Sequence, residues 1–400
     1  MRTDHHRTAV TEPSDPVAAD PAWLRSKPGL KWATAAPDVL PAWVAELDFA
    51  IPPAVRRALA DLAAVGDLGY PAWMEGPGTP LREAFRDRMT ERHGWSPDPA
   101  QVREFTDLNQ ALQTVLHVAT EPGDAVAVHV PGYPTFLRAV PKMGRQLIPV
   151  PLEHGEHGWR FDADRLDAAL AASGARTLIL VNPHNPTGRA LTAAELSAIA
   201  AVAEARDLLV ISDEIHADLT YAPAAHVPFA SLSADTQART VTMTSASKAF
   251  NIAGACCAVA HVGSARVRDG LDRLPPDLLG RVGSVGVIAT LAAWRDCDPW
   301  LAAVLRRLAE NRGLLGAALP DGIGCHRPEA TCLAWLDCRS LGLPDPAAFF
   351  LRKAGVDLIS GSSFGPCGEG FVRLNFGTTP AILAEICARM TEAVENLGRG

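Results

Sequence analysis

The sequence predicts an α/β protein in which helices wrap a mostly parallel central sheet, together with a smaller α+β domain. Short apolar or β-branched runs alternate with helical stretches along the middle of the chain, which is typical of strands joined by crossover helices. Each run is short enough to be a strand buried on both faces. The chain has 400 residues, 48% of them hydrophobic, so it can bury a large core.

Residue patterns along the chain define the expected elements in order. Helical stretches are expected over Pro53–Val65 and Ala193–Ala205, and a long one around Val285–Leu315. The apolar runs that predict strands of the central sheet are Ala125–Val130, Thr177–Val181, Leu208–Ile211 and Thr240–Thr244. Two later runs predict strands of the smaller domain, Cys332–Asp337 and Phe371–Phe376.

These elements suggest four parts of the chain. Residues 1–20 are polar and contain prolines, so we expect a flexible N-terminal arm. Residues 21–52 are expected to join the small domain, residues 53–285 to form the large domain, and residues 286–400 to form the small C-terminal domain.

Charge and cysteine content exclude several classes of function. The 45 acidic residues outnumber the 37 basic ones, giving a net charge of -8, so no chain-wide basic field is available to bind nucleic acid. The eight cysteines form no CxxC pairs and are expected to be reduced thiols rather than zinc ligands. No signal-peptide core or stretch of about 20 apolar residues is visible, so we expect a cytoplasmic protein without a membrane span.

A lysine in a serine-containing segment is the first candidate for chemistry. Only five lysines occur in the chain, and Lys248 lies in Ser245-Ala-Ser247-Lys248-Ala-Phe-Asn251, directly after an apolar strand. A desolvated lysine has a lowered pKa and can form a Schiff base with an aldehyde cofactor, while nearby hydroxyl groups can bind an anion. Taken alone, the segment fits a surface lysine in a serine-containing loop better, because short motifs often occur by chance.

Polar residues also follow two other strands of the expected sheet. Asp213 comes just past an apolar strand, where open α/β sheets bind ligands, and its carboxylate can hold a pyridinium proton or cap a helix. Asn185 lies in Asn182-Pro-His-Asn185-Pro-Thr-Gly188-Arg189, a segment that specifies a turn. An inward-pointing amide there can bind a phenolic oxygen, or the segment can be a loop without chemistry.

Arg373 is the fourth candidate, in the strand-like run Phe371-Val-Arg373-Leu-Asn375-Phe. Alternation places Val372 and Leu374 on one face of this strand and Arg373 on the other. The planar guanidinium suits two-point binding of a carboxylate. An exposed strand arginine is the alternative.

The combination of these residues resembles the fold-type I pyridoxal-phosphate (PLP) enzymes, the aspartate aminotransferase superfamily. Asn185, Asp213, Ser245, Lys248 and Arg373 follow one another in the order typical of that superfamily. Two of the three tyrosines in the chain, Tyr70 and Tyr133, also fall at matching positions. The resemblance covers nearly the whole chain, from about Trp32 to the C-terminus.

Four stretches are similar to the cystathionine β-lyase type of carbon–sulfur lyase within this superfamily. They are Leu40-Pro-Ala-Trp43-Val-Ala-Glu-Leu-Asp48-Phe, Asn182-Pro-His-Asn185-Pro, Asp213-Glu-Ile-His216-Ala-Asp-Leu and Phe364-Gly-Pro-Cys-Gly-Glu-Gly-Phe-Val-Arg373. Ordinary aminotransferases usually carry tyrosine in place of His216 and arginine in place of Cys256. Both differences favour the lyase branch.

The resemblance implies a role for each candidate. Lys248 would form the Schiff base with PLP and then move the α-proton of the substrate, and Asp213 would pair with the pyridinium nitrogen. Tyr133 would stack on the ring, and Asn185 and His216 would bond near its phenolic oxygen.

The same resemblance assigns the phosphate and the substrate. Ser245 and Ser247 would contact the phosphate, and Tyr70 would reach it from a neighbouring subunit, so a homodimer is implied. Arg373, with Asn185, would bind the α-carboxylate of an amino-acid substrate. No metal is implied.

Two positions depart from the family pattern. Relatives usually have a glycine-containing phosphate loop where this chain has Thr106-Asp107-Leu108-Asn109-Gln110, so Asp107 and Leu108 are expected to bind the cofactor although Asp107 adds a negative charge. Cys332 stands where relatives often carry an aromatic residue. A wider pocket and a bulky S-substituted cysteine are the expected consequences.

The resulting expectation is a PLP-dependent carbon–sulfur β-lyase that converts an S-substituted L-cysteine, either cystathionine or a bulkier conjugate, to a thiol, pyruvate and ammonia. An aminotransferase is the nearest alternative. Decarboxylation or oxidative deamination of the same kind of substrate is a further one, and a non-catalytic sensor is a third.

Overall fold

The computed structural model describes residues 20–76, 78–155, 158–275 and 278–397. A seven-stranded sheet forms its centre, with the strand order β2-β10-β9-β8-β7-β3-β4. β10 runs antiparallel to both of its neighbours, whereas the pairs from β9 to β4 are parallel. The strands are β2 (Val102–Phe105), β3 (Ala125–Val130), β4 (Gln146–Pro151), β7 (Thr177–Val181), β8 (Leu209–Asp213), β9 (Thr240–Thr244) and β10 (Ala258–Val262). The predicted α/β class with a mostly parallel sheet is confirmed.

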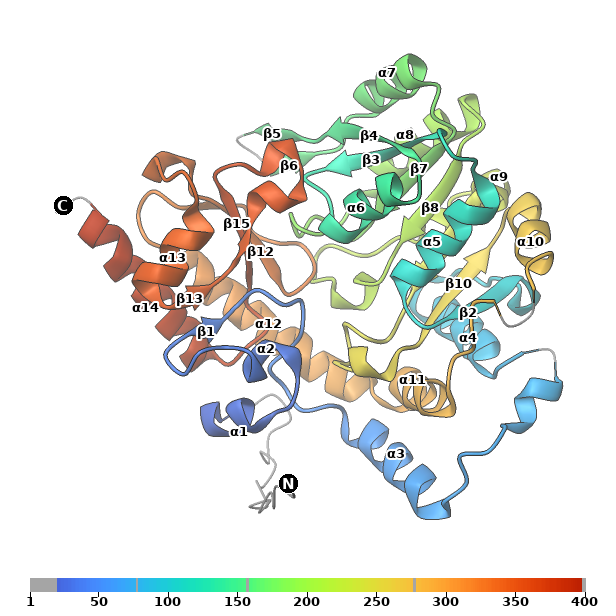
Figure 1. The fold of residues 1–400 in the computed structure, drawn as a ribbon, viewed down its shortest axis with the longest axis horizontal. Coiled ribbons are helices and arrows are strands. Elements are labelled where there is room, and N and C mark those ends of the chain that lie inside the picture. The colour runs from blue at the N-terminus through green and yellow to red at the C-terminus, as the bar shows by residue number, and fades with distance from the viewer. Residues whose placement is uncertain (1–19, 77, 156–157, 276–277, 398–400) are drawn as a thin grey trace.

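Helices cover both faces of this sheet (Figure 1). Alternate residues of the central strands face opposite cores: Ile179 and Val181 belong to one apolar cluster, and Leu178 and Leu180 to the other. The first cluster includes residues of α5 (Leu108–Ala119), α6 (Pro134–Lys142) and α10 (Ala265–Asp272), and the second includes residues of α7 (Ala163–Ser173) and α8 (Ala193–Ala205).

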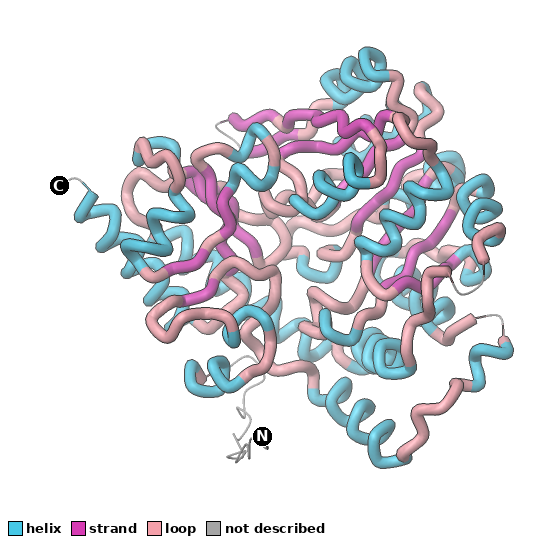
Figure 2. The backbone as a smooth tube through the Cα atoms, viewed as in Figure 1, coloured by secondary structure: helices cyan, strands magenta, loops and turns pink. Residues whose placement is uncertain are grey.

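A smaller antiparallel sheet lies apart from the large one (Figure 2). Its order is β11-β12-β15-β14, from β11 (Gly324–Cys325), β12 (Leu333–Asp337), β14 (Ile359–Ser360) and β15 (Phe371–Asn375). The helices of this part are α12 (Asp298–Ala318), α13 (Pro346–Ala354) and α14 (Pro380–Leu397).

The N-terminal segment pairs with the C-terminal part of the chain. β1 (Leu40–Pro41) forms a parallel pair with β13 (Val356–Asp357). The proposed domain boundaries stay a prediction, and nearly all of the expected N-terminal arm lies outside the described residues. The remaining elements are α1 (Pro21–Ser26), α2 (Leu30–Ala33), α3 (Pro53–Val65), α4 (Leu81–His93), β5 (Glu153–Gly155), β6 (Gly158–Arg160), α9 (Ala234–Ala238) and α11 (Ser284–Asp296).

The long helical stretch expected around Val285–Leu315 is two helices. α11 ends at Asp296 and α12 begins at Asp298, with Cys297 between them. Pro299 is the second residue of α12. Because proline has no amide hydrogen and its ring clashes with the carbonyl four residues earlier, a continuous helix cannot pass through this position without distortion. In the described part of the chain, no helix is long and apolar enough to cross a bilayer.

A buried ion pair fixes the N-terminal segment. Lys31 is 1% exposed, and its Nζ lies 2.9 Å from Oδ1 of Asp48, which is equally buried. The same Asp48 oxygen accepts a hydrogen bond from the Trp32 indole at 2.6 Å, and Lys31 also donates to the Glu46 carbonyl. These contacts join α2 to the chain that leads into α3.

We expect Lys31→Met to lower the free energy of unfolding by about 3–5 kcal/mol, because the substitution leaves the Asp48 carboxylate buried without its counter-charge. Urea unfolding measures this difference. The double variant Lys31→Met/Asp48→Asn should regain a large part of the loss, since no unpaired charge remains. A loss of less than about 1 kcal/mol in the single variant would contradict this account.

Candidate active site

A cavity of about 550 Å³ lies at the carboxyl ends of the central strands. Parallel strands bring their carboxyl ends to one edge of a sheet, so residues that follow different strands meet there. All the predicted site residues except Tyr70 line this cavity: Asp107, Leu108, Tyr133, Asn185, Asp213, His216, Ser245, Ser247, Lys248 and Arg373. Arg373 is the one that comes from the small sheet, on β15.

Asp213, the last residue of β8, is a buried carboxyl group with few partners. Its Oδ1 accepts a hydrogen bond from the Ile215 amide at 3.1 Å. Burial raises the pKa of Asp213 to about 7, and the nearby Glu214 contributes to the increase. Glu214 itself accepts hydrogen bonds from Ser212 and His226. The Asp213 carboxyl group is therefore a buried hydrogen-bond acceptor suited to a ligand atom that carries a proton.

Lys248 follows β9 and lies in the same cavity. Burial lowers the pKa of its amine, and the neighbouring Arg373 adds to the decrease. Its Nζ donates a hydrogen bond to the carbonyl of Ala45 at 3.1 Å. The lysine therefore has an amine that deprotonates more readily than one in water, as required of a nucleophile or a base.

Arg373 is buried but meets no carboxylate among the described residues. One guanidinium nitrogen donates to Oδ1 of Asn185 at 3.0 Å, and another donates to the carbonyl of Trp43 at 2.8 Å. Its Nε atom is buried without a hydrogen-bond partner, and burial lowers the pKa of the group to about 10. A buried guanidinium held by neutral oxygens is a binding site for an anion.

The N-terminal segment 43–49 forms one wall of the cavity. Trp43, Val44 and Ala45 line it, and the segment's carbonyl groups accept hydrogen bonds from side chains of β15 and of the loop after β9. These bonds are Asn375 Nδ2 to Glu46 at 2.7 Å, and Asn251 Nδ2 to Leu47 at 2.9 Å and to Phe49 at 2.8 Å, besides those of Arg373 and Lys248. The sequence motif around Trp43 marked this segment, but its carbonyl contacts could not be predicted from it.

The first turn of α5 also lines the cavity, through Leu108 and Asn109. The Asp107 carboxylate caps the helix, accepting a hydrogen bond from the Gln110 amide at 2.9 Å. The carboxylate therefore satisfies the third amide of the helix, that of Gln110. The two amides before it have no partner within the helix, so they are free to bind an anion. Ser245 and Ser247 line the same cavity, and the Ser245 hydroxyl donates to the Cys257 carbonyl at 2.6 Å.

Two other predicted residues, Tyr133 and His216, have distinct environments. Tyr133 caps α6 and packs edge-on against Phe136. His216 is buried with Nδ1 unpartnered, and burial, with Lys248 and Arg373 nearby, lowers its pKa to about 3, so its ring is neutral at pH 7.

Tyr70 is 93% exposed and does not line the cavity of its own chain. Cys332, expected to widen the substrate pocket, is buried outside the lining residues. That expectation therefore gains no support. Arg138 is a lining residue that the sequence did not reveal.

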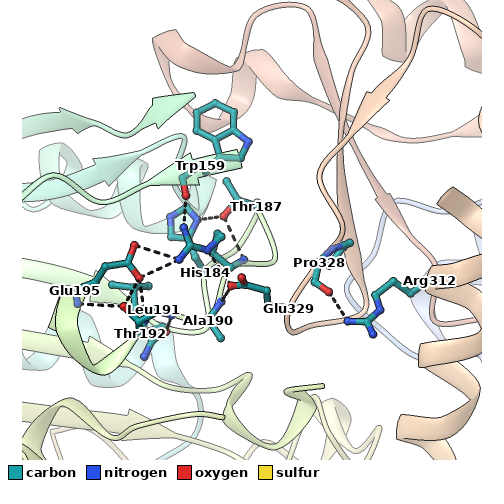
Figure 3. Close-up of polar contacts among 12 residues, drawn as sticks. Trp159, His184, Thr187, Ala190, Leu191, Thr192, Glu195, Arg312, Pro328 and Glu329 are labelled. Atoms are coloured by element: carbon teal, nitrogen blue, oxygen red, sulfur yellow. Dashed lines mark hydrogen bonds and ion pairs between the residues drawn. The ribbon is translucent and has the colours of Figure 1, made fainter. Parts of the chain in front are cut away.

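The turn that carries Asn185 is fixed from outside the cavity by Arg189. Its guanidinium contacts Glu195 of α8 and Glu329, each at 2.9 Å, and donates to the Trp159 carbonyl. Figure 3 labels these three partners. Glu329 also accepts a hydrogen bond from the Ala190 amide at 3.0 Å. One partly buried cation thus connects the turn after β7 to three segments and limits movement of Asn185.

The residues fit PLP. Asp213 is a buried carboxyl group able to hold the protonated ring nitrogen, and the first-turn amides of α5, with Ser247 in the same lining, would hold the phosphate. Lys248 would supply the amine for covalent attachment. Tyr133 supplies an aromatic wall.

Comparisons with known proteins agree with this site. The family model for aminotransferase class I and II matches residues 44–390, so the chain belongs to that family. A putative cystathionine β-lyase of Mycobacterium tuberculosis is 38% identical over 93% of this chain and 96% of its own length. The cystathionine β-lyase PatB of Bacillus subtilis is 34% identical over 89% and 93%.

A solved structure extends the comparison to the fold. The crystal structure of a putative PLP-dependent β-cystathionase from Corynebacterium diphtheriae matches with a TM-score of 0.86 and 30% identity, over 93% of this chain and 97% of that one. The fold is that of the fold-type I PLP enzymes, and the cofactor is PLP.

Without cofactor, the free energy of unfolding of the wild-type protein should fall relative to that of the Asp213→Asn variant as the pH rises from about 4 to about 7. The pKa of Asp213 is raised to about 7 in the folded chain, so the folded state keeps a proton that the unfolded chain has lost. The stability contributed by that proton is complete below about pH 4 and lost above about pH 7. Urea unfolding of both proteins across this range measures the difference. A constant difference would show that burial does not raise this pKa.

Proposed function

We propose that the protein is a PLP-dependent carbon–sulfur β-lyase that cleaves S-substituted L-cysteines to a thiol, pyruvate and ammonia. The observation that carries the proposal is that one cavity holds both the Lys248 amine and the Arg373 guanidinium. The guanidinium has no carboxylate partner among the described residues. The relatives named cystathionine β-lyase, aligned over most of their length, support the lyase branch.

Arg373 binds the α-carboxylate of the substrate. The group is positioned by Asn185 and by the Trp43 carbonyl, and its remaining nitrogen has no competing partner in the described structure. Asp213 holds the protonated ring nitrogen of PLP, which, when bound, is an electron sink for the electrons left at the substrate's Cα. His216 stays neutral beside these cations because burial lowers its pKa.

Lys248 moves the α-proton. Burial lowers its pKa, which increases the share of the neutral amine at physiological pH. The Cα–H bond breaks with its proton going to this amine, and the Cβ–S bond breaks with its electrons going to sulfur. The thiolate is a good leaving group, and hydrolysis of the released enamine gives pyruvate and ammonia.

We further propose a cytoplasmic homodimer, with Tyr70 binding the phosphate of the neighbouring subunit. Val65, Leu68 and Tyr70 are 76%, 70% and 93% exposed, and all three lie at or beyond the end of α3. An exposed apolar surface of this kind suits a second copy of the chain. The eight free cysteines support a reducing compartment.

The enzyme should release pyruvate and thiol from S-ethyl-L-cysteine without an added keto acid. Lys248→Ala should lower that rate by at least about 10³-fold, because both the attachment point and the base are lost. Pyruvate and free thiol are assayed together. Amino transfer that needs a keto acid would instead identify an aminotransferase, and release of carbon dioxide or consumption of oxygen would identify the decarboxylating or oxidative reaction.

Mixing two impaired variants tests the shared site. Lys248→Ala and Tyr70→Ala should each be impaired, but unfolding and refolding them together should restore roughly a quarter of wild-type activity. Half of the dimers formed at random are hybrids, and one of the two sites in each hybrid has an intact lysine and an intact partner tyrosine. If Tyr70 served its own chain, mixing would restore nothing.

A further inference from the structure

Arg138 is a cation in the cavity that the proposed reaction leaves unused. It lies on α6, is exposed, and lines the same cavity as Lys248 and Arg373. Within the described part of the chain it forms no hydrogen bond and no ion pair. Its guanidinium is therefore available to a ligand in that cavity.

The other charged lining residues already have functions or partners. Arg373 and Lys248 serve the α-carboxylate and the α-proton in the proposed reaction, and Asp213 serves the ring nitrogen. Asp107 caps α5 through the Gln110 amide. Arg138 is thus the cation left for the part of the substrate that lies beyond its Cβ.

The position of Arg138 is fixed by the packing of its helix. Phe136, Leu137 and Val140 are buried in the core beneath α6, which leaves Arg138 on the open side of the helix. The same cavity is lined from the small-sheet side by Ile359 and Ser363. A substituent on the substrate's sulfur that extends away from Cα toward these residues meets the apolar Ile359, the hydroxyl-bearing Ser363 and the guanidinium of Arg138.

We propose that Arg138 is a specificity-determining residue that binds an anionic group, in particular a carboxylate, at the far end of the sulfur substituent. A guanidinium binds a carboxylate through two parallel hydrogen bonds. The buried floor of the cavity excludes water from the reacting end of the substrate, whereas Arg138 at the exposed end stays in contact with water. The preferred substrates are then S-conjugates of cysteine with two separated carboxylates, one on Arg373 and one on Arg138. The proposal rests on the proposed lyase function.

The phosphate of PLP is the other anion in the cavity. A phosphate contact from Arg138 is the competing role, because Ser245 and Ser247, which are predicted to bind the phosphate, line the same cavity. The two roles differ in what they change. A phosphate contact alters cofactor affinity for every substrate, whereas a contact to the sulfur substituent alters only the preference among substrates.

The test compares three cysteine conjugates of similar size: S-(2-carboxyethyl)-, S-(2-aminoethyl)- and S-propyl-L-cysteine. With PLP-loaded wild-type enzyme, kcat/KM for the carboxyethyl conjugate should exceed that for the aminoethyl conjugate at least about tenfold. Arg138→Gln should lower the carboxyethyl-to-propyl ratio of kcat/KM about tenfold, mainly through KM, and Arg138→Lys should lower it less. Lys142→Gln, an exposed cation on the same helix outside the cavity lining, is the matched control and should leave the ratio unchanged.

Two results would overturn the proposal. The first is an unchanged carboxyethyl-to-propyl ratio of kcat/KM in Arg138→Gln. The second is a weaker PLP affinity with equal losses of kcat/KM for all three conjugates, which would assign Arg138 to the phosphate. Failure of the lyase function is recognised separately, because no conjugate would then yield pyruvate. In that case binding of the carboxyethyl and propyl conjugates, followed through the visible spectrum of the PLP-loaded protein, still tests Arg138. Selective weakening of the carboxyethyl conjugate in Arg138→Gln supports the proposal, and equal binding overturns it.

Discussion

Hydrogen bonds to the backbone of residues 43–49 are the constraint on which the cavity depends. Lys248 and Asn251 approach this segment from the large sheet's side, and Arg373 and Asn375 approach it from the small sheet. Because the donors come from two separate sheets and the acceptors from one short segment, the segment fixes the position of one sheet relative to the other. These bonds, together with the apolar cluster that contains Phe250 and Leu374, keep Arg373 and Lys248 in one cavity.

Burial shifts the pKa values of three groups in the cavity, Asp213, Lys248 and Arg373, in the direction that favours the neutral form of each. It raises the pKa of Asp213 and lowers those of Lys248 and Arg373. Each shift reflects a free-energy cost of keeping a charged group out of water. Groups of opposite charge on the cofactor and substrate offset this cost, so their binding energy also stabilises the folded chain. The extensive apolar core makes such a costly site tolerable.

Much of the large sheet could be predicted because its strands are apolar on both faces. The bounds of β3, β7 and β9 agree with the sequence prediction, and the strand ends placed Asn185 and Asp213 in one cavity. Residues 21–52 were expected to join the small domain, but the particular pairing of β1 with β13 leaves no local pattern and could not be predicted. Arg138 was missed for a similar reason: a lone arginine on an amphipathic helix looks like any solvated residue. The cap formed by Asp107 was visible only once the start of α5 was known.

The pairing of β1 with β13 also orders events during biosynthesis. Leu40 and its partner Val356 are separated by most of the chain, and Arg373 lies further on still. A ribosome produces residues in sequence, so the large sheet can assemble while the last strands are still inside the exit tunnel. The wall of the cavity that carries Arg373 is then missing, and the segment that carries Trp43 has only its contacts to Lys248 and Asn251. The cofactor can therefore be held in its complete surroundings only after β15 has been synthesised and has folded.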